Sequence, residues 1–272
     1  MKFCINTKML NPDLDLFEKI KIASVSGFQG IEPWINEFEF VCKKDLVKCL
    51  NDYGVEVPTS IAIKGYFEND GDLMGVEDNH LVIFNECLRR IELSVEIGAK
   101  FIVAIPALSN RNHFTTYQQS ISYYEKLLEL GERIGCNPTL EFIGTTKQIY
   151  NFELCEKFLD NFVSKPTMVI DAYHIWRGNG HMDDFLNFDA RRVSCFHISD
   201  ADKMIDREIH RDRDRVMPLD GKIDLHKFAE NVKKIGYTGF ISAGVYNPNL
   251  WNMDQYEMAR KCRESLKNLF EN

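Results

Sequence analysis

YQQSISYYEKLLELGERIGCNPTLEF, residues 117–142, contains the unit from which the fold can be predicted. Residues 117–134 form a long amphipathic run, which predicts a helix. Gly135 follows this run, and glycine is favoured just past a helix because it adopts positive φ without strain. The short apolar run 139–142 then predicts a strand. This stretch therefore predicts one helix, one turn and one strand.

The same alternation extends over the whole chain. Glycines are expected to end five helices, at Gly27, Gly54, Gly98, Gly135 and Gly236. We expect strands at 2–6, 28–32, 55–61, 101–105, 139–142, 168–171, 193–197 and 240–245. We expect helices at 13–25, 43–53, 79–97, 117–134, 152–162, 225–235 and 255–270. This order predicts the α/β class and a single (β/α)8 TIM barrel, one domain over residues 1–272. An open doubly wound sheet is the alternative, but no Gly-x-Gly-x-x-Gly motif follows the first strand.

Composition and charge narrow the class of protein. Hydrophobic residues make up 44% and charged residues 27%, and the net charge is −8 from 33 basic and 41 acidic residues. This balance is typical of a globular protein with a full core and argues against a dedicated nucleic-acid binder. The one dense basic stretch, 207–215, is interleaved with acidic residues. We expect it to be a solvated loop.

Location is predicted from the chain start and from the cysteines. The first residues, MKFCINTKML, have no long apolar segment, and no apolar stretch elsewhere is long enough to span a bilayer. The eight cysteines are scattered singly, with no Cys-x-x-Cys pair. We expect a cytoplasmic protein with no membrane partner, in which the cysteines are buried free thiols.

Three chemically active residues end expected strands. They are Glu141, Asp171 and His197. In a barrel, the carboxyl ends of the strands meet on one face, and carboxylates with an imidazole form a site for a divalent metal ion such as Mn, Mg, Co or Zn. A hydrogen-bonded polar network without metal is the alternative.

Four further residues are candidates for substrate binding. His174 lies three residues after Asp171, Arg215 offers a fixed cation in a loop, and Trp34 and Lys64 follow strand ends. Trp34 and Trp176 could form an apolar wall over a sugar ring, with simple packing as the alternative for each. A structural role for His174 and a solvated position for Lys64 also remain open. The other five histidines are expected on helices or surface loops, without a role: His80, His113, His181, His210 and His226.

The chain resembles the xylose-isomerase-like TIM barrel superfamily, in the branch of sugar epimerases, inosose isomerases and dehydratases, and type IV endonucleases. The motifs that carry the resemblance are GIEPW, TLEFIG, IDAYHIW, FHISD, RVMPLDG followed by KIDL, and GYTGFISAGVYN. The resemblance implies a metal held by Glu141, Asp171, His197 and a fourth carboxylate. The fourth position is Gly244 in this chain, so one ligand is missing.

The missing carboxylate bears on the implied reaction. In the sugar epimerases, the first and last Glu also form the acid/base pair, so a two-base epimerisation is in doubt here. A one-base proton shuttle by Glu141 remains open for an isomerisation or a dehydration. Water, Glu32, Asp200 or Asp202 could fill the vacancy. A small sugar or polyol is the implied substrate and a homodimer is possible; a catalytically degenerate sugar-binding barrel is the alternative.

The DNA-repair branch of the same superfamily fits this chain less well. Its members hold three zinc ions with additional histidines. Here Ile105 stands at one such position, SIAIKGYF has no histidine at another, and the loop triplet ends in Val216. The resemblance therefore implies a single-metal site and no nucleic acid.

Overall fold

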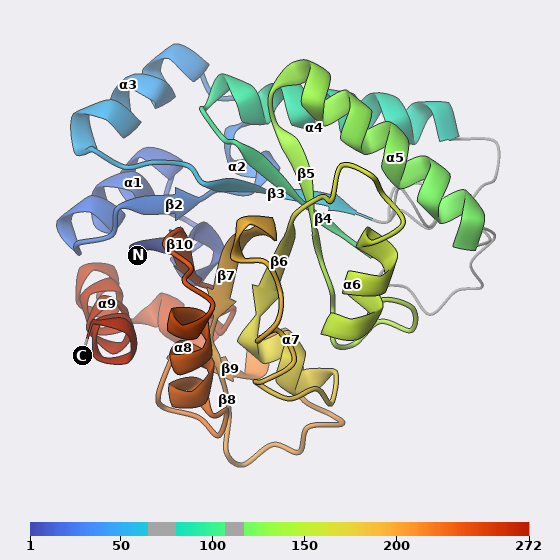
Figure 1. The fold of residues 1–272 in the computed structure, drawn as a ribbon. Coiled ribbons are helices and arrows are strands. Elements are labelled where there is room, and N and C mark those ends of the chain that lie inside the picture. Colours follow the sequence, from blue (N-terminus) through green and yellow to red (C-terminus); the bar gives the residue numbers. More distant parts are fainter. Residues whose placement is uncertain (65–79, 107–116, 272) are drawn as a thin grey trace.

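The computed structural model describes residues 1–64, 80–106 and 117–271, and strands alternate with helices along the chain (Figure 1). The strands of the main sheet are β1 (Lys2–Asn6), β2 (Gly30–Glu32), β3 (Thr59–Lys64), β4 (Phe101–Ile105), β5 (Asn137–Glu141), β6 (Met168–Asp171), β7 (Val193–Ile198) and β10 (Phe240–Ala243). The helices are α1 (Leu16–Val25), α2 (Ile35–Phe38), α3 (Lys43–Tyr53), α4 (His80–Glu96), α5 (Tyr117–Ile134), α6 (Phe152–Leu159), α7 (Ala172–Arg177), α8 (Leu225–Lys234) and α9 (Gln255–Phe270). A short antiparallel pair, β8 (Asp200–Ala201) and β9 (Arg215–Val216), lies outside this sheet.

The eight parallel strands form a nearly closed barrel. Their order is β2-β1-β10-β7-β6-β5-β4-β3, so the first and last strands of the chain are neighbours. The seam between β2 and β3 is joined by isolated bridges, Gly30 with Glu56 and Trp34 with Ile61. The predicted TIM barrel is therefore confirmed.

Local sequence signals set the helix ends. Asp15 caps α1 by accepting a hydrogen bond from the Glu18 amide, which is why this helix starts at Leu16 and not at residue 13. All five glycines that were expected to end helices have φ between 63° and 101°. This left-handed conformation favours glycine.

One strand prediction was displaced. The apolar run 55–61 suggested the third strand, but β3 spans Thr59–Lys64. Val55 and Val57 are buried in the approach to the strand, on either side of Glu56, which forms an isolated bridge with Gly30 of β2. Lys64 consequently ends β3 and does not follow it.

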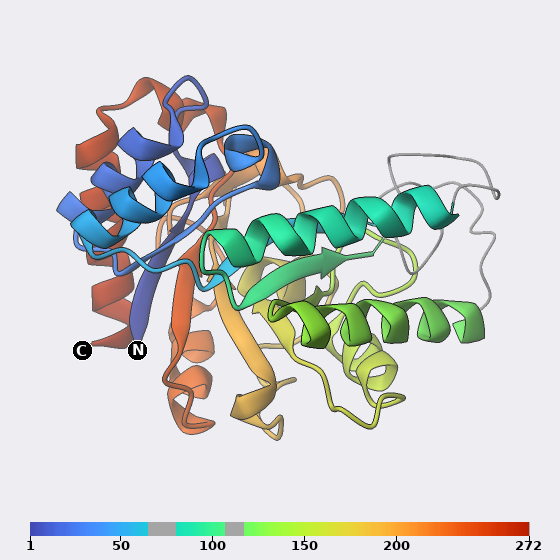
Figure 2. The same cartoon turned by 90° about the horizontal axis from the view of Figure 1, so that it is seen from above.

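Two apolar layers hold the barrel together. Strand residues that face outward pack against the helices in one large cluster, which includes Ile102, Leu140 and Phe196. Strand residues that face inward form a smaller cluster, which includes Val103, Val169 and Cys195. This alternation follows from the two-residue period of a strand. In Figure 2, α4 and α5 run side by side over the same part of the barrel.

Strand register brings the polar strand ends to one face. Asn6 pairs with Glu32, and Asp171 pairs with His197. His197 in turn pairs with Ser242 of β10. Residues from five strands therefore meet at the carboxyl end of the barrel, where the site of a TIM barrel lies.

The sequence also predicted buried cysteines and no membrane-spanning segment. Six of the eight cysteines are buried, as expected, but Cys42 is exposed and Cys49 is half-buried. Among the described helices, none has the length and apolar composition needed to cross a membrane.

Candidate metal centre

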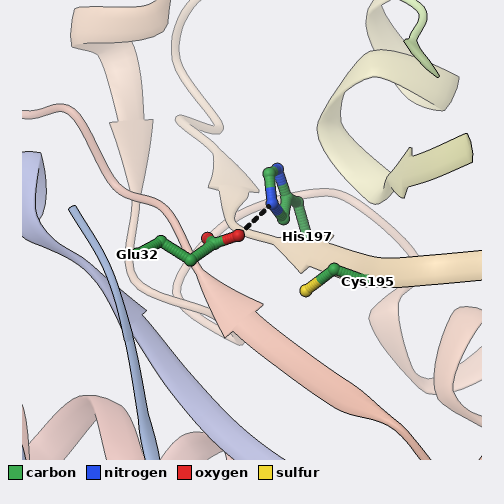
Figure 3. A group of neighbouring side chains, drawn as sticks. All are labelled: Glu32, Cys195 and His197. Carbon is green, nitrogen blue, oxygen red and sulfur yellow. Dashed lines mark hydrogen bonds and ion pairs between the residues drawn. The ribbon is translucent and has the colours of Figure 1, made fainter. Parts of the chain in front are cut away.

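His197 lies between two carboxylates. Its Nδ1 is 2.9 Å from Glu141 Oε1, and its Nε2 is 3.0 Å from Glu32 Oε1. Thr59 and Ser242 also donate hydroxyl hydrogen bonds to Glu32, which is fully buried. Figure 3 shows the Glu32 and His197 side chains, from β2 and β7, pointing toward each other. We call Glu32, Glu141 and His197 the imidazole cluster.

The charges in the imidazole cluster depend on one another. Burial lowers the pKa of His197, but the neighbouring carboxylates of Glu32 and Glu141 outweigh it and raise this pKa well above the usual value. Burial raises the pKa of Glu32, but the His197 charge and the hydrogen bonds to the carboxylate lower it overall. Without a metal ion, His197 is therefore an imidazolium held by two carboxylates.

Cys195 lies beside this cluster but remains a thiol. Its Sγ lies within 4.8 Å of ligand atoms of Glu32 and His197. Burial raises the pKa of Cys195 to about 12, and the thiol donates to the Phe240 carbonyl at 3.3 Å. Because a thiolate is the form that binds metals, we assign Cys195 no metal role.

Arg215 forms the centre of a second cluster. Its Nη1 donates to Asp171 Oδ2 at 2.8 Å, and its Nη2 donates to Asp212 Oδ1 at 2.7 Å. Nη2 also lies 3.2 Å from His174 Nε2. The guanidinium stacks on the Tyr173 ring at 3.9 Å from its centroid. We call Asp171, His174, Asp212 and Arg215 the guanidinium cluster.

The guanidinium cluster fixes the charge state of its members. Burial raises the pKa of Asp171, but the charges of Arg215, His174 and His197 lower it to about 2. Burial lowers the pKa of His174, and the Arg215 charge adds to this effect. At neutral pH, Asp171 is therefore an anion and His174 is neutral. The solvated-loop expectation for 207–215 was wrong for Arg215, which is 2% exposed.

The two clusters meet at Glu141 and Asp171. One ligand atom each from Glu141, Asp171 and His174 lies within 4.8 Å of the others. Buried carboxylate oxygens and imidazole nitrogens at this spacing suit a divalent cation. The cation would also balance negative charge, because the carboxylates of the two clusters outnumber the one permanently charged group, the Arg215 guanidinium. Glu141, Asp171 and His174 therefore fit a metal ion. The predicted set of Glu141, Asp171 and His197 does not form such a group among the described residues, although His197 Nδ1 lies 2.9 Å from Glu141 Oε1.

The two histidines differ in how well each would serve as a ligand. The Gly144 amide nitrogen lies 3.3 Å from His174 Nδ1, and the Arg215 Nη2 atom lies 3.2 Å from His174 Nε2. A neutral imidazole carries one proton, so only one of these two contacts is a hydrogen bond. His197 instead directs Nδ1 at the Glu141 carboxylate while Glu32 holds its other nitrogen. A carboxylate behind the imidazole is the usual support of a metal-binding histidine.

Trp34 and Lys64 lie together at the edge of the site. Trp34 is half-buried, and its Nε1 donates to Asn6 Oδ1 at 3.0 Å. Lys8 and Lys64 place their Nζ atoms 3.8 and 5.8 Å from the centroid of the Trp34 ring. All three side chains line a pocket of about 360 Å³ between α2, β3 and α4. No residue of the imidazole or guanidinium cluster lines this pocket, so the substrate contacts of Trp34 and Lys64 stay a prediction.

Other expectations turned out differently. Asp200 accepts from the amides of Ala201, Gly221 and Ile223, so it holds a loop and does not fill the vacancy near Gly244. Asp202 likewise accepts from a local amide. His210 is 1% exposed and hydrogen-bonds to Tyr173, so the surface position expected for it was wrong. Trp176 packs edge-on against His210, which favours the packing alternative. His113 lies outside the described residues.

Gly244 has an unexpected neighbour. Its amide donates to Ile198, and a Cβ built on it would lie 3.5 Å from the Tyr246 hydroxyl and 4.0 Å from Asn6 Cβ. Sequence reasoning missed Tyr246. The available signal was its position two residues past the glycine that replaces the expected carboxylate.

Comparisons with known proteins agree on the fold. Residues 20–269 match the model of the xylose isomerase-like TIM barrel family. An inosose isomerase of Bacillus velezensis is 22% identical over 278 aligned residues, covering 97% of this chain and 95% of that protein. An inosose isomerase of Bacillus subtilis is 23% identical and covers 70% of this chain and 69% of that protein.

Solved structures give the same result. A crystal structure of an IolI protein with a binding zinc atom has a TM-score of 0.86 at 18% identity and covers 99% of this chain and 98% of that chain. A structure of L-ribulose 3-epimerase has a TM-score of 0.80 at 14% identity and covers 99% of this chain and 94% of that chain. At these identities, the likeness concerns the fold.

Proposed function

We propose, from the premise that this chain belongs to the xylose isomerase-like TIM barrel family, that it is a metal-dependent isomerase or epimerase of a small sugar or polyol. The reaction would be proton transfer at a carbon next to a carbonyl group. The single observation that carries this proposal is the position of His197 between Glu141 and Glu32, beside Asp171. The isomerase and epimerase relatives, and the zinc atom of the IolI structure, support it.

Glu141, Asp171 and His197 would hold the metal ion. His197 is preferred over His174 because a divalent cation at His174 Nε2 would lie against the Arg215 guanidinium. When bound, the ion would polarise the substrate carbonyl and a neighbouring hydroxyl.

The remaining roles follow from the charges of the side chains. Glu141 would take a proton from the carbon next to the carbonyl and return it, which is general acid–base catalysis. Arg215 and His174 would orient hydroxyl groups of the substrate, since a buried guanidinium and a neutral imidazole offer fixed polar contacts. Trp34 would cover one face of the substrate, and Lys64 would contact its polar rim.

Metal analysis of the purified protein is the first test. We expect about one divalent ion per chain, lost in Asp171→Ala and His197→Ala. His226→Ala is the matched control, because His226 is exposed on α8 and should leave the metal content unchanged. A wild-type protein that holds no ion after incubation with Mn, Co or Zn would contradict the proposal.

A substrate panel is the second test. Inososes and ketohexoses are incubated with metal-loaded protein, and products are identified by NMR. An isomer or epimer is expected; a dehydrated product would place the activity among the lyases. Binding without turnover would indicate the degenerate sugar-binding barrel, an alternative favoured by the absence of a side chain at Gly244.

Gly244→Glu separates these outcomes further. If the added carboxylate creates epimerase activity that wild type lacks, the natural chain is a degenerate member. If it abolishes an existing activity, the glycine is part of the working site.

A further inference from the structure

We propose that the Tyr246 hydroxyl is a catalytic hydrogen-bond donor, which serves the substrate oxygen beside the position where Gly244 lacks a carboxylate. This inference rests on the proposed isomerase function and adds a group to it.

The position follows from Gly244. A side chain there would begin 3.5 Å from the Tyr246 hydroxyl oxygen and 3.8 Å from Cζ. Gly244 directly follows β10, and its amide is bonded to Ile198 at the end of the neighbouring β7. The Tyr246 hydroxyl therefore lies next to the space that a carboxylate at position 244 would enter.

The direction of the hydroxyl hydrogen follows from Asn6. Asn6 Oδ1 accepts from the Lys8 amide at 3.1 Å and from Trp34 Nε1 at 3.0 Å, and both partners can only donate. These two bonds fix the orientation of the Asn6 amide, so its Nδ2 is the atom that faces Tyr246. Nδ2 then donates to the Tyr246 oxygen at 3.3 Å. Because the oxygen accepts this bond, its own hydrogen remains to be donated.

Ring packing holds the phenol in place. The Tyr246 ring meets the Trp34 ring edge-on with centroids 6.4 Å apart, and the Arg215 guanidinium lies 5.1 Å from the Tyr246 centroid. Tyr246 is half-buried. In the part of the chain that the structure describes, no acceptor for its hydrogen is found.

With a phenol at this place, the reaction uses one base, Glu141, and one hydrogen-bond donor, Tyr246. Glu141 removes the proton, the C–H electron pair forms a carbon–carbon double bond, and the carbonyl π pair moves onto its oxygen. Tyr246 donates a hydrogen bond to that oxygen and keeps its proton. Glu141 returns its proton to the former carbonyl carbon, while the hydroxyl proton of the neighbouring carbon passes to the former carbonyl oxygen. Substrate and product are isomers and no co-reactant is consumed.

This arrangement favours isomerisation over two-base epimerisation. A neutral phenol stabilises developing negative charge but does not remove a proton from carbon. Glu141 therefore acts on one face of the substrate. Isotope label on the substrate carbon should appear partly in the product, because a single carboxylate carries it across.

Tyr246→Phe is the direct test, since it removes only the hydroxyl and keeps the ring against Trp34. We expect kcat to fall about 100-fold, the typical effect of losing one donor to a developing oxyanion, with KM and metal content almost unchanged. Tyr237→Phe is the matched control, because its hydroxyl faces the backbone carbonyls of Ser194 and Phe240 and no proposed metal ligand. A Tyr246→Phe enzyme with kcat within twofold of wild type would overturn the inference and leave the proposed function intact.

A binding experiment keeps the inference testable if wild type shows no turnover, a result that would count against the proposed function. Glycolohydroxamate, which mimics an enediolate, is titrated calorimetrically into metal-loaded wild type and Tyr246→Phe. We expect about tenfold weaker binding in the variant, as for loss of one hydrogen bond to a charged group. Equal affinities, or no binding to either protein, would overturn the role of Tyr246.

Discussion

The imidazole cluster and the guanidinium cluster differ in the kind of cation each contains. Both lie at the carboxyl end of the barrel and pair a buried cation with two carboxylates, of which Asp212 alone is exposed. His197 can give up its proton, whereas Arg215 keeps its charge at any accessible pH. Only the imidazole cluster can therefore exchange a proton for a metal ion, whereas the guanidinium cluster supplies a fixed charge.

Removing the fixed charge should have the largest effect. Arg215→Met leaves Asp171 as a buried carboxylate without its partner, and the free energy of unfolding should fall by about 3–5 kcal/mol. Urea denaturation of chelator-treated protein measures this change. Arg191→Met is the control, because Arg191 pairs with Asp189 in an exposed position and its loss should not be measurable. A loss under about 1 kcal/mol for Arg215→Met would mean that water replaces the guanidinium.

Weakening the support of His197 should have the next largest effect. Glu32→Gln removes the carboxylate behind the imidazole, and metal affinity should fall by about 10–100-fold. Competition with a chromophoric chelator measures the affinity. Glu56→Gln, which changes an exposed glutamate across the barrel seam from β2, should bind metal like wild type. If Glu32→Gln also binds like wild type, the imidazole is oriented by other contacts.

Metal affinity should depend on pH, because His197, unlike Arg215, can lose its proton. The raised pKa of His197 means that its proton stabilises the metal-free fold below the ordinary pKa, and that this contribution is lost as pH rises through the raised one. A metal ion must displace this proton, so metal affinity should increase with pH by up to about tenfold per unit. Calorimetry in buffers of different ionisation enthalpy should count about one proton released per ion. Affinity independent of pH between 6 and 8 would contradict this mechanism.

The smallest effect on stability is expected at Gly244, where the expected fourth carboxylate is missing. Gly244 does not have positive φ, and a Cβ there meets nothing closer than 3.5 Å. Gly244→Ala should therefore change the free energy of unfolding by less than about 0.5 kcal/mol, measured by urea denaturation. A larger loss would show that the space beside Tyr246 cannot accept even a methyl group.

The sequence predicted the parts of the fold that depend on local chemistry. Gly54 and Gly135 end helices because the left-handed turn favours glycine, and Asp171 ends a strand because the apolar run stops there. The third strand was displaced because Val55 and Val57 only flank the isolated bridge at Glu56, whereas the regular pairing with β4 starts at Thr59. An apolar run alone does not show where regular strand pairing begins.

Contacts between distant segments explain what the sequence did not predict about the site. Arg215 ends a stretch of balanced charge and starts β9, and its burial depends on Asp171, which is 44 residues away. Glu32 was one of several possible substitutes for the missing ligand, and only the barrel register places it behind His197. Tyr246 lies within the GYTGFISAGVYN motif but received no role from the sequence, and its role is inferred from the three-dimensional neighbours of Gly244 and Asn6.

The neighbouring positions of β1 and β10 have a consequence for biosynthesis. The Asn6–Tyr246 bond joins residues 240 positions apart, and Lys2 pairs with Phe240. During translation, β1 emerges first but finds this partner only when most of the chain has been made. The hydrogen bond that orients the Tyr246 hydroxyl is therefore among the last contacts to form as the chain leaves the ribosome.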